Sequence, residues 1–567
     1  MSSLGRPGVG RRSISSQHLT SNDVSSYAPP SSSSTTDLRP LPQSFAPLAS
    51  FDQAQAIPFD KSILTIPHKK DMMTIKAIIV GAGIGGLCLA LMMELAGIEY
   101  EILERMTSQE PHRGTGVALG PPVLRLFEQM GLLDQIEAMS KPMTGLTTMD
   151  KDRRKTGRLE ATDSTRYGYP YRLLHRHELT TLLRSRVPAS HIHHSKLVTE
   201  IHQNPNGASV KCADGSTYYG DIIVGADGAD SLVRERMLTA LKEQNKLPEA
   251  DLEPTHYEQH CIGGLSPKLK VEEFPVVGER SSEFRVQTAK DDAASLWYIP
   301  LPGNRVAWHF FIHNATPKVK HHPYSHSHGN LDRHSGSQPY VSSHSKTSSS
   351  SNLSSSSSMG GANSKINLDW LTPVYDLERP DLQELLNSPC CIGPGTVRDF
   401  VSRTPRADIS SIDISDRIYK TWYSGRIVLL GDACHSTYLM GGQGALQAIL
   451  DGVCLVNLLH DMEYNSPPEL AKAFKKYHAK RYPVIKGAKD DSTTLEKLFH
   501  DKGFMAGVMR KMLFNTMWTL SLANDKYNNN RPQLSFLNFV EDRGTSKANR
   551  QKVSARLLRN RTYALSV

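Results

Sequence analysis

One glycine-rich turn constrains the fold of this chain more than any other feature. Residues 75–80 form a short apolar run typical of a buried parallel strand, and the next six residues read Gly-Ala-Gly-Ile-Gly-Gly. We expect Gly81 to form the tight turn, Gly83 to let the backbone approach a pyrophosphate, and Gly86 to let the following helix pack closely on the strand. The N-terminal amides of that helix, predicted over residues 84–96, would face the phosphates.

A second strand and an acidic residue complete this unit. Residues 99–103 form a predicted strand that leads to Glu104, whose carboxylate would accept hydrogen bonds from the hydroxyl groups of an adenosine ribose. Arg105, the next residue, is a further candidate cofactor contact. A glycine motif alone is weak evidence, but strand, turn, helix, strand and terminal acid in this order predict a βαβ dinucleotide-binding unit.

Two more glycine-anchored strand ends lie far along the chain. The strand predicted over residues 221–224 runs into Gly-Ala-Asp-Gly at 225–228, and the strand predicted over 425–430 runs into Gly-Asp-Ala-Cys-His at 431–435 and then Gly-Gly-Gln-Gly at 441–444. In their order and spacing, the three motifs resemble those of single-component (class A), aromatic hydroxylase-like flavoprotein monooxygenases. The resemblance covers everything except both tails and a serine-rich insertion.

The resemblance implies an α/β fold. A Rossmann-like FAD-binding domain with a parallel sheet would be interleaved with a mainly antiparallel β-sheet substrate domain, followed by a helical C-terminal region. The 567 residues suit two or three domains. The expected segments are 1–72 as a disordered serine-rich tail; 73–142, 175–254 and 416–490 as the FAD-binding domain; 143–174, 255–320 and 366–415 as the substrate domain; 321–365 as a disordered histidine- and serine-rich insertion; and 491–567 as the C-terminal helical region and tail.

The resemblance also assigns further cofactor contacts. Asp432 would accept hydrogen bonds from the ribityl chain of FAD, and a helix starting near Gly444 would aim its free amides at the pyrimidine edge of the flavin ring. Asp227 would support the pyrophosphate region, although an Asp-Gly turn that caps a helix is the alternative interpretation. The remaining cofactor-binding candidates are Arg113, Arg176, Gly228, Gly431 and Gly442.

The implied chemistry is monooxygenation. NADPH or NADH would reduce FAD, O2 would form a flavin hydroperoxide, and one oxygen atom would pass to a moderately apolar organic substrate of aromatic, polyketide or terpenoid type by hydroxylation or epoxidation. Many family members have a proline beside the reactive flavin edge, whereas residues 436–440 of this chain read Ser-Thr-Tyr-Leu-Met. His435 and Tyr438 are the catalytic candidates here, and a packing role is the alternative for His435.

Two other functions remain open on the sequence. One is an FAD-dependent reductase or dehydrogenase of a lipid or terpenoid, and the other is a flavin-bearing redox sensor or scaffold. Halogenation is disfavoured, because Ser295 stands where the halogenase signature has its first tryptophan.

Composition excludes several other classes of protein. The net charge of +9 is spread thinly, without a basic block or an aromatic-interleaved basic face, which argues against a nucleic-acid partner. The seven cysteines show no metal-ligand spacing and are odd in number, so we expect no metal site and a reducing compartment. The histidines of 321–365 are interpreted as disordered, because flexible imidazoles do not preorganise a metal shell.

Membrane contact and location follow from two further segments. The longest apolar run, residues 77–93, is too short for a membrane span of about 20 residues. Residues 503–524 suit an amphipathic helix, which either packs on the protein or makes peripheral membrane contact. We expect an intracellular, cytoplasmic protein, with mitochondrial and membrane-peripheral locations as alternatives, since the N-terminus carries Arg6, Arg11 and Arg12 among serines. The oligomeric state is not predicted.

Overall fold

The computed structural model describes residues 75–108, 115–161, 164–289, 294–320, 380–436, 442–500, 525 and 527–566. Several predictions fall outside these residues. They concern the N-terminal tail, the insertion at 321–365, the helix at 503–524, and the side chains of Arg113 and Tyr438.

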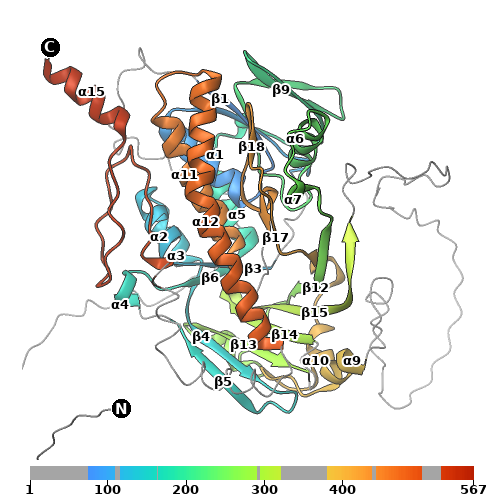
Figure 1. Cartoon of the computed structure of the whole chain (residues 1–567). Coiled ribbons are helices and arrows are strands. Elements are labelled where there is room, and N and C mark those ends of the chain that lie inside the picture. The colour runs from blue at the N-terminus through green and yellow to red at the C-terminus, as the bar shows by residue number, and fades with distance from the viewer. Residues whose placement is uncertain are drawn as a thin grey trace, which may run out of the picture. The chain divides into compact units, whose positions relative to one another are not determined.

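A six-stranded sheet forms the first half of the fold (Figure 1). Its neighbouring strands pair in parallel, except for the antiparallel pair at one edge. Strands from three distant parts of the chain lie at its centre, and their side chains are almost completely buried. In order across the sheet, the strands are β18 (Tyr423–Ser424), β19 (Ile427–Leu429), β11 (Ile222–Gly225), β1 (Lys76–Val80), β2 (Glu99–Leu103) and β7 (Ile192–His193).

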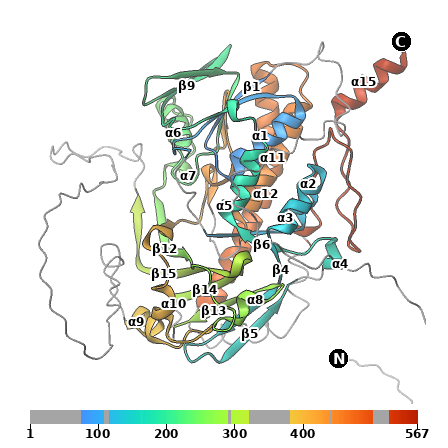
Figure 2. The same cartoon turned by 180° about the vertical axis from the view of Figure 1, so that it is seen from behind.

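Helices pack tightly against this sheet. Helix α1 (Ile84–Ala96) packs on both α11 (Gly444–His460) and α5 (Arg176–Ser185), and α12 (Pro467–His500) packs along α11 (Figures 1 and 2). Eleven of the thirteen residues of α1 are buried, because protein surrounds this helix on nearly every side. It ends at Gly97, whose φ of 67° is the left-handed conformation that glycine adopts readily.

A nine-stranded, mainly antiparallel sheet forms the second half. Only β4 and β13 pair in parallel. In order, its strands are β16 (Ile409–Ile414), β12 (Thr255–Leu265), β15 (Arg305–Lys320), β14 (Ala294–Leu301), β13 (Ser282–Thr288), β4 (Lys141–Met149), β6 (Arg172–His175) and β3 (Gly116–Leu119), with β5 (Lys155–Glu160) beside β4. Helices α9 (Pro380–Asn387) and α10 (Val397–Val401) share a hydrophobic core with one face of this sheet. The two sheets and the C-terminal helices confirm the predicted fold class.

The remaining elements connect or cover these sheets. They are the three-stranded sheet of β8 (Val198–Asn204), β9 (Gly207–Cys212) and β10 (Thr217–Gly220); the short pair β17 (Arg417–Ile418) and β20 (His435–Ser436); and the helices α2 (Pro121–Gln129), α3 (Leu133–Ala138), α4 (Ser164–Tyr167), α6 (Leu232–Glu243), α7 (Glu249–Leu252), α8 (Pro275–Gly278) and α15 (Ala555–Ser566).

The two halves interleave more finely than the predicted segments. Strand β3 lies within the segment 73–142, which was assigned to the FAD-binding domain, yet it pairs with β6 in the nine-stranded sheet. The C-terminal segment that contains Leu534 is hydrogen-bonded to α2. The Gln129 side chain donates to Leu534 O at 3.0 Å and accepts from Leu534 N at 2.7 Å. The exact domain boundaries therefore remain a proposal.

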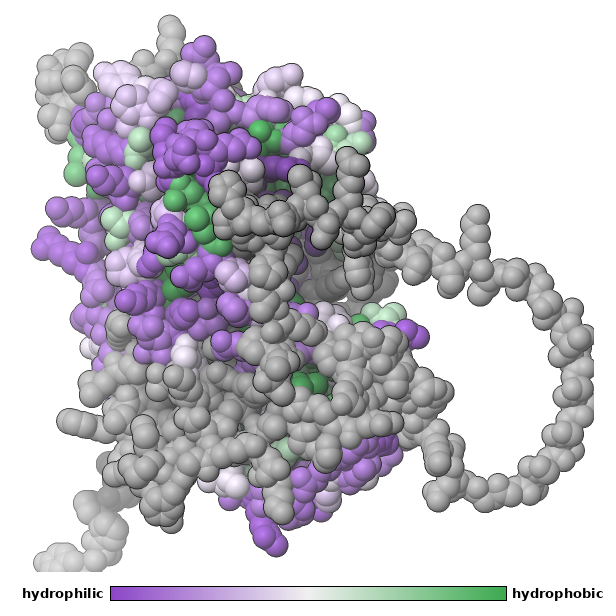
Figure 3. Space-filling view, turned by 45° about the vertical axis from the view of Figure 1, so that its right-hand side comes forward, coloured by the Kyte–Doolittle hydropathy of each residue, from purple (hydrophilic) through white to green (hydrophobic). Residues whose placement is uncertain are grey.

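In the part of the chain that the structure describes, no helix is both long enough and apolar enough to span a membrane. The coloured part of the face in Figure 3 is mainly hydrophilic, with small apolar patches. Large hydrophobic side chains that are exposed lie on different elements; they are Leu197, Tyr219, Val271, Ile412, Tyr464, Phe539, Val553 and Leu558.

Candidate functional site

The three glycine motifs meet at the carboxyl ends of adjacent strands. Ala226 N donates to Val80 O at 2.9 Å, and Leu430 N donates to Gly225 O at 2.9 Å. Gly81 has a φ of 106°, and a Cβ there would lie 2.5 Å from Ala226 O. The first two turns therefore pack directly on each other, and segments about 350 residues apart in sequence come to border one site.

The glycines of the first turn meet different needs. A Cβ at Gly86 would overlap the carbonyl oxygen of Gly81, so close packing of α1 on the turn requires glycine there. Gly83 has an ordinary φ of −71°, and an added Cβ would meet no atom of the described residues within 4 Å. No side chain caps α1 at this residue. The open space beside the free helix amides fits a pyrophosphate.

Glu104 stands beside this turn. One carboxylate oxygen accepts from Ala82 N at 2.7 Å and the other accepts from Met106 N at 2.8 Å. These bonds hold the carboxylate at the end of β2, and each oxygen retains a lone pair for a ribose hydroxyl group. Arg105 is exposed.

The second motif caps a helix, as its alternative interpretation suggested. Asp227 Oδ2 accepts from Leu232 N at 2.8 Å and from Val233 N at 3.2 Å. Its other oxygen, Oδ1, is buried without a hydrogen-bond partner among the described residues, so it can accept a bond from a bound group. Gly228 follows with a φ of 82°. Burial raises the pKa of Asp227.

Arg234 links the second motif to the third, and the candidate set from the sequence missed it. Its guanidinium donates to Ala433 O at 3.0 Å and to Ala229 O at 2.7 Å. Because both acceptors are backbone carbonyls, only the folded arrangement reveals this role. The sequence signal that could have suggested it was an arginine in the first turn of the helix that follows the second glycine motif.

Asp432 and Arg176 face a common region. The surrounding protein partly desolvates the carboxylate and so raises the pKa of Asp432, and the charges of His435 and Arg176 act in the opposite direction. Burial lowers the pKa of Arg176, while Asp432 acts to raise it. The Asp432 side chain nevertheless borders open space. A Cβ at Gly444 would lie 3.7 Å from its Oδ1, so the carboxylate stands beside the first residue of α11.

The start of α11 suits a negatively charged ligand edge. Its N-cap residue, Gln443, makes no capping hydrogen bond with its side chain, so the first backbone amides of the helix keep their donor capacity. Gly431 and Gly442 have φ values of 61° and 59°, a region that favours glycine. These residues shape the turns on either side of the site.

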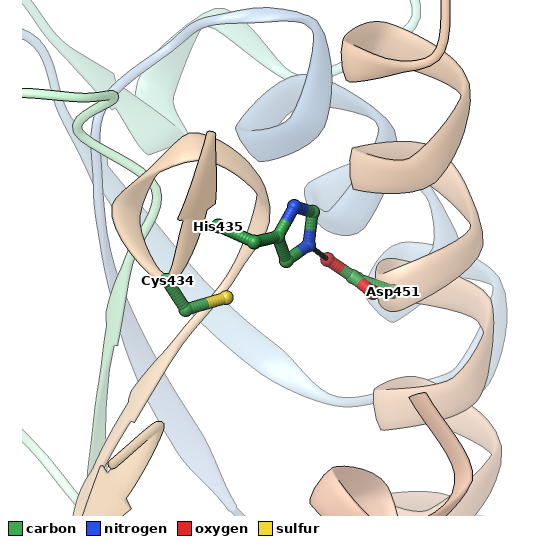
Figure 4. Close-up of side chains that lie close together, drawn as sticks. All are labelled: Cys434, His435 and Asp451. Carbon is green, nitrogen blue, oxygen red and sulfur yellow. Dashed lines mark hydrogen bonds and ion pairs between the residues drawn. The ribbon is translucent and has the colours of Figure 1, made fainter. Parts of the chain in front are cut away.

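Three side chains that could ligate a metal, Cys434, His435 and Asp451, lie close together (Figure 4). His435 Nε2 lies 2.7 Å from Asp451 Oδ2, and Cys434 is adjacent. Arg481 Nε donates to Asp451 Oδ1 at 2.6 Å, which places a guanidinium where a cation would be repelled. Burial raises the pKa of the Cys434 thiol, which disfavours the thiolate that a metal requires. This cluster is therefore better suited to a structural role.

The network around Asp451 ties α11 and α12 to the turn that carries Asp432. Asp451 Oδ2 also accepts from Gly431 N at 3.0 Å, and Arg481 donates to Gln447 Oε1 at 2.6 Å. Burial by itself raises the pKa of Asp451, but the charges of Arg481 and His435 outweigh it and hold the pKa below its usual range. Sequence reasoning missed both Asp451 and Arg481, although an acid within the apolar stretch of α11 was a signal.

His435 is 2% exposed, and its ring also packs on Trp422 with a centroid distance of 5.3 Å. This placement favours the packing alternative over proton transfer to a substrate. Arg113 and Tyr438 cannot be placed in the site, because they lie outside the described residues.

Comparison of the sequence with known proteins finds an FAD-binding family and FAD-dependent relatives. A family model described as "FAD binding domain" matches residues 74–270 and 396–492. The FAD-dependent monooxygenase atmM of Aspergillus flavus is 25% identical over 458 residues, covering 78% of this chain and 83% of that protein. The FAD-dependent monooxygenase janM of Penicillium janthinellum is 27% identical, covering 74% and 76% respectively.

Solved structures share the fold. Klebsiella pneumoniae HpxO, complexed with FAD and uric acid, superposes with a TM-score of 0.56 at 17% identity, covering 82% of this chain and 97% of that chain. PqsL of P. aeruginosa, in complex with 2-aminobenzoylacetate, has a TM-score of 0.53 at 18% identity, covering 77% and 99% respectively.

Proposed function

The chain belongs to the FAD binding domain family and is an FAD-dependent monooxygenase, and from this premise we propose that NADPH or NADH supplies its electrons and that it hydroxylates or epoxidises a moderately apolar organic molecule. The observation that carries the proposal is the meeting of three glycine motifs at the ends of β1, β11 and β19. Asp432 and the start of α11 complete this arrangement.

The residues present fit FAD. In this proposal, the α1 amides beside Gly83 hold the pyrophosphate and Glu104 holds the adenosine ribose. Asp432 accepts hydrogen bonds from the ribityl chain, and Arg176 supplies positive charge beside it. Support comes from the open space at Gly83, the unpartnered Asp227 Oδ1 and the exposed carboxylate of Asp432.

Bound FAD would supply electron transfer and the activation of O2. The protein binds the cofactor, orients the substrate and excludes water. The uncapped amides at the start of α11 would stabilise negative charge on the bound flavin ring. Arg234 and Asp451 hold the second and third turns in register, so that these amides and Asp432 keep their positions.

The substrate is proposed to be a small organic molecule that lies between the cofactor and the nine-stranded sheet. HpxO and PqsL were solved with uric acid and 2-aminobenzoylacetate, which are both of that size. Aromatic side chains of β14 and β15 suit an apolar substrate. Trp297 packs on Phe311 with a centroid distance of 5.6 Å.

We further propose a cytoplasmic location, with peripheral membrane contact through residues 503–524 as a separate hypothesis. All seven cysteines are free, and five of them are buried, as is typical of a protein in a reducing compartment. A fluorescent fusion of the full chain, compared with one lacking residues 503–524, tests both statements.

The decisive experiment combines reduction with isotope labelling. The FAD-loaded protein is titrated with NADPH and with NADH without oxygen, and air is then admitted while the flavin absorption is followed. We expect bleaching by at least one of the two, and recovery in air. Under oxygen-18 gas, a panel of aromatic, polyketide and terpenoid compounds should yield a product that carries one labelled atom. Turnover without label would indicate the reductase or dehydrogenase alternative, and no turnover would favour the sensor.

A further inference from the structure

His309 lies in the middle of β15, on the sheet face opposite α9 and α10. Side chains alternate along a strand, so His309 shares its face with Ala307 and Phe311. Trp308 and Phe310 point the other way, into the hydrophobic core that includes α9 and α10. His309 is half-buried, and it is the polar side chain between two apolar neighbours on its face.

Thr115 connects His309 to the proposed cofactor site. The hydroxyl oxygen of Thr115 lies 2.6 Å from His309 Nε2. The backbone oxygen of Thr115 accepts from Arg176 N at 3.0 Å, and the charge of Arg176 interacts with Asp432. Two short contacts therefore connect the imidazole to Arg176, a residue of the proposed cofactor site.

The residues around the imidazole ring of His309 leave space for it. Gly263 pairs with His309 across β12 and β15, and a Cβ at Gly263 would lie 2.8 Å from His309 Cδ2. Glycine thus leaves room for the imidazole. Phe311 stacks beside the ring at a centroid distance of 6.1 Å with an interplanar angle of 29°, and Trp297 packs on Phe311 in the same buried cluster. The imidazole therefore has mainly apolar neighbours on its face.

The imidazole is neutral near pH 7. Burial lowers the pKa of His309 to about 4. Cys261, which pairs with Phe311 across β12 and β15, is also neutral, because burial raises the pKa of its thiol to about 12. A neutral imidazole has one donor and one acceptor nitrogen. With Nε2 bonded to Thr115, Nδ1 has no hydrogen-bond partner among the described residues and can bond an uncharged hydroxyl or carbonyl group.

We propose that His309 determines substrate specificity in this monooxygenase, by forming a hydrogen bond from Nδ1 to a hydroxyl or carbonyl group of an uncharged aromatic substrate. Thr115 is the positioning residue that holds the imidazole. The inference rests on the proposed function, because it assumes that the substrate lies on this face of the sheet.

The test uses a matched pair of ligands, 2-naphthol and 2-methylnaphthalene, which differ by a hydroxyl in place of a methyl group. Their dissociation constants are measured on the FAD-loaded protein from the change in flavin absorption. We expect 2-naphthol to bind about tenfold more tightly. His309→Phe should bring the ratio to about one, Thr115→Val should reduce it, and Thr115→Ser should preserve it.

His260→Gln is the matched control, because His260 is also a buried histidine on this sheet but bonds Asp413 at 2.6 Å, and its neighbours along β12 place it on the other face. This variant should keep the wild-type ratio. Flavin content and melting temperature are recorded for every variant, and His309→Asn is used if the phenylalanine variant does not fold.

Equal affinity of the wild-type protein for the two ligands, or no binding of 2-naphthol, would overturn the proposal, as would a His309→Phe variant that keeps the tenfold ratio. Failure of the monooxygenase proposal is distinguishable from these outcomes. It would appear as absent oxygen-18 incorporation in a protein that still distinguishes the two ligands.

Discussion

The two sheets of this protein place their functional groups in different ways. In the six-stranded sheet, these groups lie in turns that directly follow the strands, such as Gly81 to Gly86 after β1. In the nine-stranded sheet, they are side chains in the middle of strands, and His309 faces the site only because β12, β14 and β15 pair in one register. A turn is a local pattern, whereas a strand's facing side depends on partners distant in sequence.

Several variants can test this comparison between the two sheets. We expect the largest effect from Arg481→Met, in helix α12. Removing the guanidinium leaves the buried Asp451 carboxylate poorly compensated, so the free energy of unfolding of the apoprotein should fall by about 3–5 kcal/mol. Urea unfolding measures this change. Lys472→Met, at an exposed site on the same helix, serves as the control. A loss below about 1 kcal/mol would show that the network is not required.

Gly86→Ala should destabilise the apoprotein by about 1–3 kcal/mol and also abolish FAD retention. The new Cβ overlaps the Gly81 carbonyl and forces α1 away from the turn. Melting temperature and bound flavin after gel filtration are the two measurements. A stable variant with full flavin occupancy would contradict the packing argument.

Gly264→Ala tests the same kind of contact in the other sheet. Its Cβ would lie 2.5 Å from the ring of Trp308, which is fully buried, so we expect a loss of about 1–3 kcal/mol in the free energy of unfolding. Because this contact lies on the face away from the cofactor, the FAD dissociation constant should stay near the wild-type value. If FAD affinity fell as much as in Gly86→Ala, the expectation that this substitution affects stability but not cofactor binding would be wrong.

Gly83→Ala should separate cofactor binding from stability. Among the residues that the structure describes, none has an atom within 4 Å of the added Cβ, and the backbone conformation suits alanine, so the apoprotein should melt at the wild-type temperature. FAD affinity should fall by at least about tenfold, because the methyl group intrudes on the pyrophosphate. Reconstitution of apoprotein with FAD measures it, and normal affinity would remove Gly83 from the proposed site.

The smallest effect is expected from deleting residues 321–365, between β15 and α9. Shortening a long connection changes the loop-closure entropy little, so stability should change by less than about 1 kcal/mol and flavin content should not change. Calorimetry and flavin absorption check this. A large loss of either would mean that the insertion contributes to the nine-stranded sheet.

Much of the six-stranded sheet and of the helices that pack on it could be predicted from the sequence. The strand at 75–80, the helix at 84–96 and the strand at 99–103 are confirmed to within one residue, and the helix predicted to start near Gly444 begins there. Each has a local signal in its apolar pattern or its glycines. The roles of these residues toward FAD, NADPH or NADH remain predictions.

The parts that could not be predicted depend on long-range pairing. Asp451 and Arg481 have no local motif that identifies them as partners, because they come from different helices. Strand β3 was assigned to the FAD-binding segment, and only its pairing with β6 reveals the sheet in which it lies.

By itself, the sequence determined the order of strands, turns and helices around the glycine motifs, since glycine conformation and apolar periodicity act over a few residues. Only the tertiary structure decided which distant side chains meet. Burial and strand register brought His309 to Thr115 and Arg481 to Asp451, because such contacts depend on how whole elements pack rather than on the residues beside them in the chain.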